Sequence, residues 1–268
     1  MIPPRTIGSL FSGIGGLELG LEAATNARTL WQVEKEPFCR EVLAKHYPEA
    51  TRYDDVCTVG AHNLAPVDVI CGGFPCQDLS YAGKGAGLAG ERSGLWREYR
   101  RIVGELRPRY VFVENVSALL ARGLGTVLGD LSSLGYDAVW TTLRASDVGA
   151  PHRRERLFIL AYAASQGLQG AVRREPSDAP RCAGREESVR REPAVVRESD
   201  GLPPLVDNAR WPAGLGEPQH EWEPPRVEGR FPAHSNRLKA LGNAVVPQVA
   251  MLAWRVLFAH MIAAREGA

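Results

Sequence analysis

The segment Ser9-Leu-Phe-Ser-Gly-Ile-Gly-Gly-Leu17 joins a short apolar run, which begins at Thr6, to a stretch of helical periodicity. Its three glycines therefore fall in a turn between a strand and a helix, where the backbone can approach a ligand closely. Glu34 follows the next apolar run, 21 residues after Gly13, at a position where an acidic side chain can bind ribose hydroxyls. These residues indicate a site for an adenosine-bearing cofactor; a glycine-rich turn beside a solvated glutamate is the alternative.

Apolar runs alternate with helical spacing up to about residue 164, and this alternation predicts an α/β fold in which helices cover a parallel sheet. The helical spacing is clearest at residues 95–106 and 124–134. The expected strands are residues 6–11, 29–33, 67–71, 110–113, 136–143 and 156–161.

The chain changes character between residues 166 and 230. These 65 residues hold 9 of the 19 prolines, no lysine, 10 arginines and 12 acidic residues, with little periodicity. We expect a separate region here, in which residues 173–200 form a flexible loop and the aromatic residues after them anchor a small ordered piece. An amphipathic helix follows at residues 246–261, so the main domain resumes near residue 234.

Composition excludes several classes of protein. The 268 residues are 44% apolar and 24% charged, as in an ordinary globular chain, and no apolar run reaches the ~20 residues that span a bilayer. Five cysteines without a C-x-x-C pair and six scattered histidines argue against a disulfide framework and a metal site. Because the formal charge of the whole chain is only +1, a polyanion would have to be bound by local basic patches. We therefore expect a cytoplasmic protein without metal or membrane contact.

Cys76 is a candidate nucleophile. The segment Cys71-Gly-Gly-Phe-Pro-Cys76-Gln77 follows the third apolar run, at the edge where open α/β sheets bind ligands. A cysteine attacks as thiolate and needs a polar, partly exposed site; a buried, inert cysteine is the alternative. Residues 77–94 contain five glycines, which favours either a mobile lid or a plain surface loop.

Two further motifs suit the same site. Glu114-Asn-Val116 follows the run at residues 110–113, which places its carboxyl group for proton transfer beside the cysteine loop. Pro151-His-Arg-Arg-Glu-Arg156 precedes the last expected strand. In an extended chain Arg154 and Arg156 point to the same side, where two guanidinium groups can bind an anion or a carbonyl-rich ring.

Five motifs resemble, in order and spacing, those of the DNA cytosine-5 methyltransferases, and the chain looks like a compact bacterial or phage member. The match covers residues 5–164 and about 234–260. It implies an α/β fold of the class I S-adenosylmethionine-dependent methyltransferase type, which is Rossmann-like with a mostly parallel sheet. Residues 1–164 and 234–268 would form the catalytic domain, and residues 165–233 a small irregular target-recognition region. The motifs are Phe11-Ser-Gly-Ile-Gly-Gly16, Gly73-Phe-Pro-Cys-Gln77, Glu114-Asn-Val116, Arg154-Glu-Arg156 and Gly242-Asn-Ala-Val245.

The resemblance also implies the cofactor, S-adenosyl-L-methionine, and the residues that bind it. Phe11 would stack on the adenine, Glu34 would bind the ribose, and Asp55 would contact the adenine edge. Two positions depart from the family pattern: Ser9 replaces the acidic residue that often opens the first motif, and His152 replaces a frequent glutamine. The implied cofactor residues are Phe11, Ser12, Gly13, Ile14, Gly16, Leu17, Glu34, Lys35, Asp55, Val56, Gly73, Pro75, Leu95 and Asn243.

The chemistry that the resemblance implies is covalent. Cys76 would add to C6 of a flipped-out cytosine in double-stranded DNA, and Glu114 would hydrogen-bond or protonate N3, so that C5 can take the methyl group. Arg156 would hold the O2 carbonyl, and Arg154 would support the loop and the negative charge near it. The residues expected at the flanking phosphates are Ser80, Lys84 and Arg92.

Other functions compete with this hypothesis. An RNA cytosine-5 methyltransferase would share the scaffold, but the Cys-Phe-Thr motif of the tRNA-modifying branch does not occur here. A catalytically silent DNA-binding protein would not need Cys76, Glu114 and Arg156, and a nicotinamide enzyme would leave the Pro-Cys and Arg motifs without a role. The recognition region carries a formal charge of −2, which favours a few arginines at base edges and a short target. We expect a monomer without an obligate protein partner, in a restriction-modification system or a phage.

Overall fold

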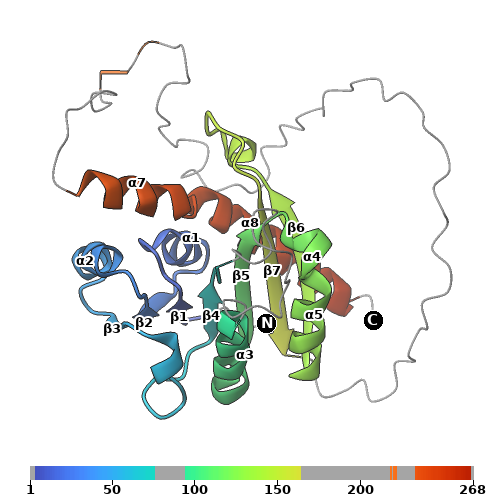
Figure 1. Ribbon diagram of the computed structural model, residues 1–268. Helices are drawn as coiled ribbons and strands as arrows, with labels where there is room; N and C mark the ends of the chain where they lie inside the picture. Colours follow the sequence, from blue (N-terminus) through green and yellow to red (C-terminus); the bar gives the residue numbers. More distant parts are fainter. Residues whose placement is uncertain (1–3, 76–93, 164–217, 219, 222–232, 267–268) are drawn as a thin grey trace, which may run out of the picture.

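The computed structural model describes residues 4–75, 94–163, 218, 220–221 and 233–266. Within these residues one sheet of seven strands carries helices on both faces (Figure 1). The strand order is β3-β2-β1-β4-β5-β7-β6. The strands are β1 (Thr6–Leu10), β2 (Arg28–Val33), β3 (Thr51–Tyr53), β4 (Val69–Gly72), β5 (Tyr110–Val116), β6 (Tyr136–Leu143) and β7 (Arg156–Ala163).

Strand direction sets where the functional edge of the sheet lies. β1 to β5 pair in parallel, so their carboxyl ends meet at one edge. β7 runs antiparallel to both β5 and β6, which makes the sheet mixed. The expected mostly parallel α/β fold is therefore confirmed, with one reversed strand. Because parallel neighbours need a crossover between them, the intervening helices lie over the faces of the sheet.

Helices cover two separate cores. They are α1 (Gly16–Thr25), α2 (Pro37–His46), α3 (Gly94–Leu106), α4 (Leu119–Arg122), α5 (Leu124–Ser133), α7 (His234–Asn243) and α8 (Pro247–Glu266), with 3-10 turns η1 (Val56–Thr58) and η4 (Ala145–Val148). Successive side chains of a strand point to opposite faces. Ile70 and Val111 thus join the core under α3 and α5, whereas Val69 and Phe112 join the core under α1 and α8.

The expected strands are confirmed, with small shifts of their ends. β1 ends at Leu10, because Phe11 has a φ of 56° and begins the glycine turn. β5 continues to Val116, so Glu114 lies inside a strand instead of after it. No sequence pattern predicts β3, since three residues are too few to show a period.

α1 and α8 pack closely because glycines of α1 face the C-terminal segment. A Cβ atom on Gly16 would lie 2.2 Å from the carbonyl oxygen of Val245, and one on Gly20 would lie 2.4 Å from that of Pro247. Any larger residue would force the backbones apart. This packing brings the chain after residue 233 back to the glycine turn, and Figure 1 shows α7 lying above α1.

α8 is a core helix, although the segment His234–Ala264 is long and apolar enough to cross a membrane by length and composition alone. Ala250, Trp254 and Leu257 are buried in the core under α1 and α8. The rings of Trp254 and Phe112 meet edge to face, with centroids 5.5 Å apart. Burial of this face against the sheet accounts for the apolar composition of the helix.

Candidate active site

A cavity of about 580 Å³ lies at the carboxyl ends of β1, β2, β4 and β5. This is the edge at which open α/β sheets bind ligands, and the volume is typical of a small-molecule site. Ten predicted cofactor residues and two predicted catalytic residues line it. The ten are Phe11, Gly13, Glu34, Lys35, Asp55, Val56, Gly73, Pro75, Leu95 and Asn243, and the two are Glu114 and Arg156.

A smaller cavity of about 60 Å³ lies against the glycine turn. Gly13 has a φ of 56° and no atom within 4 Å of the position that a Cβ would take, so a ligand can approach its backbone. The other four predicted cofactor residues line this cavity: Ser12, Ile14, Gly16 and Leu17. It adjoins the larger cavity, because both are lined by Phe11, Gly13, Gly73, Glu114 and Asn243.

Glu34 ties the glycine turn to the loop after β2. Its carboxylate accepts hydrogen bonds from the backbone N–H of Gly13 at 2.7 Å and from that of Glu36 at 2.8 Å. Phe11, at the start of the turn, stacks with Tyr99 at a centroid distance of 6.5 Å. Both side chains line the larger cavity. The contacts of Glu34 with ribose and of Phe11 with adenine stay predictions.

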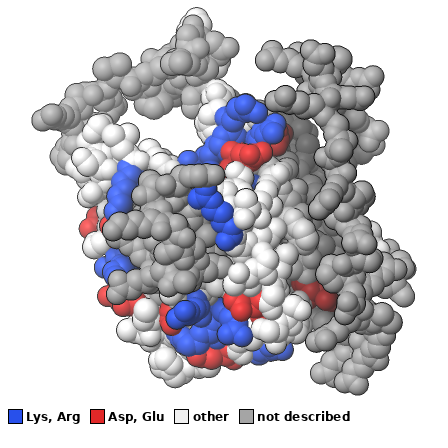
Figure 2. Space-filling view, turned by 45° about the vertical axis from the view of Figure 1, so that its right-hand side comes forward, with Lys and Arg blue, Asp and Glu red and all other residues white. Residues whose placement is uncertain are grey.

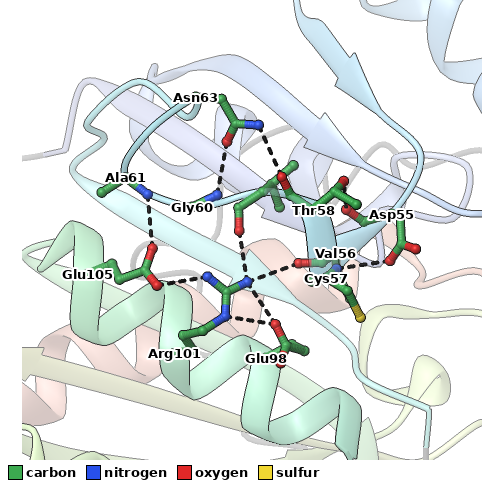
Figure 3. A network of polar contacts seen from close by, with 11 residues as sticks. Asp55, Val56, Cys57, Thr58, Gly60, Ala61, Asn63, Glu98, Arg101 and Glu105 are labelled. Atoms are coloured by element: carbon green, nitrogen blue, oxygen red, sulfur yellow. Dashed lines mark hydrogen bonds and ion pairs between the residues drawn. The ribbon is translucent and has the colours of Figure 1, made fainter.

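Arg101 of α3 holds the loop that carries Asp55 and Val56 (Figure 3). Its guanidinium donates hydrogen bonds to the carbonyl oxygens of Val56 at 3.2 Å and of Val59 at 2.8 Å. The Asp55 carboxylate accepts a hydrogen bond from the backbone N–H of Cys57 at 2.9 Å. The backbone at the predicted adenine edge is therefore fixed from below by a helix of the core.

Two acidic residues hold Arg101 in place. Glu98 and Glu105, one turn before and after it on α3, accept its hydrogen bonds at 2.7 and 2.8 Å. Glu105 also accepts a hydrogen bond from the backbone N–H of Ala61 at 2.9 Å. Sequence reasoning missed Arg101, because acidic neighbours three and four residues away are common on any exposed helix face.

Glu114 of β5 and Arg156 of β7 form an ion pair, with 3.0 Å between Oε1 and Nε. Their side chains are 12% and 21% exposed. Burial raises the pKa of Glu114, while the positive charges of Arg156 and Arg154 oppose that rise. The second carboxylate oxygen lies over Gly73, where a Cβ would come within 2.7 Å of it. A residue without a side chain at position 73 thus leaves room for this carboxyl group.

Asn115 anchors the loop that follows β4. Its side-chain N–H donates a hydrogen bond to the carbonyl oxygen of Phe74 at 3.1 Å. Pro75, the next residue, lines the larger cavity. The predicted nucleophile Cys76 comes directly after Pro75 but lies outside the described residues, and so do the predicted phosphate contacts Ser80, Lys84 and Arg92. Of the predicted recognition region, only residues 218, 220, 221 and 233 are described.

Arg154 differs from the expectation. Its φ is 27°, so the backbone at Arg154 is not extended, and strand alternation does not place its side chain relative to Arg156. The guanidinium of Arg154 donates hydrogen bonds to the carbonyl oxygens of Gly242, at 2.8 Å, and Ala244. Arg154 therefore holds the junction between α7 and α8, and this junction carries Asn243 into the cavity wall.

Lys239 and Glu36 close one side of the larger cavity, which both of them line. Their Nζ and Oε1 atoms are 2.6 Å apart and link α7 to the start of α2. No sequence signal predicts this pair, because 203 positions separate the two residues. Within the described part of the chain, no group of three or more His, Cys, Asp and Glu side chains could hold a metal ion.

The sheet order with its reversed β7 and the cofactor-type cavity at the carboxyl edge define a class I S-adenosylmethionine-dependent methyltransferase fold, which is Rossmann-like. The class can be narrowed further. The sequence model of C-5 cytosine-specific DNA methylases matches residues 5–192, and the chain belongs to this family. The resemblance found in the motifs is thereby confirmed.

Known relatives agree with this assignment. The type II methyltransferase M2.BsuMI of Bacillus subtilis is 37% identical over 161 residues, which are 57% of this chain and 41% of that protein. The type II methyltransferase M.HhaI of Haemophilus parahaemolyticus is 31% identical over 164 residues, which are 60% of this chain and 50% of that protein. The chain thus spans half or less of the length of these relatives.

A solved structure from E. coli has the same arrangement. It is described as a DNA modification methyltransferase encoded within a prophage, and it is 28% identical to this chain. The TM-score is 0.51, and the match covers 59% of this chain and 47% of that chain.

Proposed function

We propose that this protein transfers a methyl group from S-adenosyl-L-methionine to C5 of a cytosine in a short duplex DNA target. The observation that carries the proposal is the Glu114–Arg156 ion pair, which lines the same cavity as the glycine turn. A carboxyl group beside a guanidinium group matches N3 and O2 of cytosine, which lie on the same edge of the ring. The family and the type II methyltransferases among the relatives support this activity.

The larger cavity suits the cofactor in its chemistry. Phe11 and Leu95 offer apolar surface for the adenine, and Glu34 and Asp55 offer carboxylates for ribose hydroxyls and the adenine edge. The open backbone at Gly13 leaves space for the methionine part. When bound, S-adenosyl-L-methionine supplies the methyl group as an electrophile.

Cysteine addition would make C5 reactive. C5 of cytosine is too weak a nucleophile to take a methyl group while the ring is aromatic. In the proposed route the thiolate of Cys76 would form a bond to C6 and Glu114 would give a proton to N3, which would leave an enamine. The electron pair of this enamine at C5 would take the methyl group, whose bond to the sulfonium sulfur would break to leave S-adenosylhomocysteine. A base, which we propose is water, removes the C5 proton. The S–C6 bond then breaks, and the N3 proton returns to Glu114.

The electrostatics of the ion pair suit this role. Because burial raises the pKa of Glu114, its proton is available nearer neutral pH than that of an exposed carboxyl group. Arg156 would hold O2 of the base and stabilise negative charge that develops there. Arg154 would act indirectly: its hydrogen bonds fix the α7–α8 junction, which lines the cofactor cavity.

A cytosine must leave the duplex to reach the cavity, at a cost of a few kcal/mol. On the face of the molecule drawn in Figure 2, the Lys and Arg side chains lie in separate patches between acidic and uncharged surface, which agrees with the formal charge of +1. Local contacts would therefore hold the DNA. We assign phosphate contacts to Ser80, Lys84 and Arg92, and the reading of bases to residues 165–233, both outside the described residues.

We propose that the protein modifies DNA in a restriction-modification system or a phage, in the cytoplasm and as a monomer without an obligate protein partner. The bacterial type II methyltransferases and the prophage-encoded protein among the relatives support this setting.

The test is methyl transfer by the purified protein. Duplex DNA and tRNA would be offered with labelled S-adenosyl-L-methionine, and the DNA product would be sequenced after bisulfite treatment, with Cys76→Ala as the inactive control. We expect label in DNA and protected cytosines at one short motif. Label in tRNA alone would replace the proposal by RNA cytosine-5 methylation. DNA binding without methyl transfer would indicate a catalytically silent DNA-binding homologue.

A further inference from the structure

A buried polar cluster lies beneath the glycine turn. Its members are Ser9 of β1, Ser12 of the turn, Glu18 in the first turn of α1 and Gln32 of β2, and none is more than 8% exposed. The Ser12 hydroxyl donates a hydrogen bond to that of Ser9 at 2.9 Å. The side-chain N–H of Gln32 donates to Oε1 of Glu18 at 3.4 Å, and Glu18 itself is fully buried.

Two oxygen atoms of this cluster lack a donor. Oε2 of Glu18 and Oε1 of Gln32 have no hydrogen-bond partner among the described residues. The hydroxyl groups of Ser9 and Ser12 and the backbone N–H of Glu18 are near enough to oppose the rise in the pKa of Glu18, but none of them makes a hydrogen bond of good geometry to Oε2. A buried acceptor that stays unpaired costs stability, and a buried carboxylate costs most. Because Glu18 lines a cavity, its unpaired oxygen indicates a donor that arrives with a ligand.

The smaller cavity places this carboxyl group beside the predicted cofactor site. Glu18 and Ser9 line it together with the glycine turn, and its volume of about 60 Å³ exceeds the ~10–15 Å³ that one water molecule requires. None of the described residues that line it is basic, and both charged ones, Glu18 and Glu114, are acidic. A cationic donor of a few atoms therefore fits this space best.

We propose that Glu18 binds the α-ammonium group of the methionine part of S-adenosyl-L-methionine through its free Oε2. The inference rests on the proposed function, which makes this molecule the ligand. The proposal also explains the departure from the family pattern at Ser9, where an acidic residue is frequent. The small side chain of serine leaves room for the carboxylate of Glu18 in the cluster. Glu18 is then a cofactor-binding residue that the motif comparison did not include.

A purely structural explanation exists and makes a different prediction. One proton on Glu18 would let Oε2 donate to the free Oε1 of Gln32, which would pair both oxygens without any ligand. Burial favours that neutral form and raises the pKa of Glu18 to about 6. In that case the amino group of the cofactor would gain nothing from Glu18.

The experiment compares two ligands that differ only in the amino group: S-adenosylhomocysteine and its deamino analogue, with hydrogen in place of the α-amino group. Calorimetry at pH 7.5 would give both affinities for the wild type, Glu18→Gln and Glu18→Asp. We expect the wild type to prefer S-adenosylhomocysteine by about tenfold or more, as for a charge-assisted hydrogen bond. Glu18→Gln should lose this preference, whereas Glu18→Asp, which keeps the charge, should retain part of it.

A third ligand serves as the folding control. 5′-Methylthioadenosine has no amino-acid part, so its affinity should be equal in all three proteins. A preference that survives in Glu18→Gln, or a wild type without any preference, would overturn the role of Glu18. Failure of the cofactor assignment looks different, since the wild type would then bind none of the three ligands. Failure of the DNA step alone would show in the methyl-transfer assay and leave these affinities unchanged.

Discussion

The side-chain amide of Asn115 on β5 donates a hydrogen bond to the carbonyl oxygen of Phe74, 3.1 Å away in the loop after β4. One strand therefore carries the proposed proton donor, Glu114, and also holds the loop that leads to the proposed nucleophile. Adjacent residues of β5 thus carry the proposed proton donor and hold Phe74, which lies two positions before the proposed nucleophile Cys76 in the sequence.

Replacement of Asn115 tests the role of this contact. Asn115→Asp keeps the shape but removes the hydrogen bond to the carbonyl oxygen of Phe74, and loss of a hydrogen bond to a buried group costs about 1–3 kcal/mol of folding stability. We expect the single-turnover rate of methyl transfer to fall by ~10²-fold, since small misplacements of reacting groups have effects of this size. Cofactor affinity, measured by calorimetry, should change much less. Equal losses in rate and affinity would mean that Asn115 supports the whole site.

Arg101 should affect cofactor binding and leave the chemistry intact. Arg101→Met removes the hydrogen bonds to the carbonyl oxygens of Val56 and Val59, so the adenine-edge loop loses its support. We expect a raised KM for S-adenosyl-L-methionine with an unchanged kcat, because the loop would bind the cofactor equally strongly in the ground state and in the transition state. Arg101→Lys should recover little, because an ammonium group cannot bind both carbonyls and both carboxylates. The matched control is Arg100→Met, a partly exposed arginine of α3 that pairs with Asp130.

Trapping with 5-fluorocytosine identifies the nucleophile. Fluorine leaves no removable proton at C5 after methylation, so the adduct should persist through heating in detergent, form only with S-adenosyl-L-methionine, and contain a peptide linked through Cys76. Cys76→Ala should give no adduct. Cys71→Ala should still give it, because burial raises the pKa of the Cys71 thiol well above its usual range and keeps it protonated. A cross-link at Cys71 would show that the thiol is assigned wrongly.

Glu114 should control the rate at high pH. The proton that it gives to N3 is lost as pH rises through its pKa, which burial raises above the ordinary value of 4.5. The rate should therefore decline on the alkaline side of that pKa. Glu114→Gln should lower the rate by ~10²–10⁴-fold and remove the decline. A pH–rate profile of single turnovers checks both effects, and a decline that persists in the variant would belong to another group.

Glu18 should make the free protein less stable at neutral pH. Its pKa is raised by burial from 4.5 to about 6, so the folded state binds a proton more readily than the unfolded state. Stability then falls as pH rises from 4.5 to 6, and above pH 6 the cost is on the order of 2 kcal/mol. Without cofactor, Glu18→Gln should melt a few degrees higher than the wild type at pH 7.5. The difference should shrink at pH 5, and a gap that is constant with pH would exclude titration of Glu18 as its cause.

Local patterns predict most of the strands, and they fail where a contact is not local. The apolar run of β6 is plain in the sequence, but nothing in it says that β7 inserts between β5 and β6. That insertion is what brings Glu114 next to Arg156. Motif order predicts a role for both residues, whereas their pairing is a property of the sheet.

The features that sequence patterns miss have equally specific causes. Strand alternation cannot place the side chain of Arg154, because a φ of 27° is not extended backbone. Arg101 and Lys239 escape notice because their partners are backbone carbonyls and a residue 203 positions away. Glu18 lies two residues after Gly16, but its burial depends on the packing of α1 over β1 and β2 and has no signature in the sequence.

The contact of Gly16 and Gly20 with the segment at Val245 and Pro247 has an evolutionary consequence. The chain leaves the catalytic core after β7 and returns at α7, and the elements on both sides of this gap pack against the same sheet. The described elements on both sides of residues 164–233 are therefore joined through the sheet and through these glycine contacts. If residues 165–233 read the target, as proposed, their exchange between relatives would leave these contacts in place, and target choice could evolve at a different rate from catalysis within one gene.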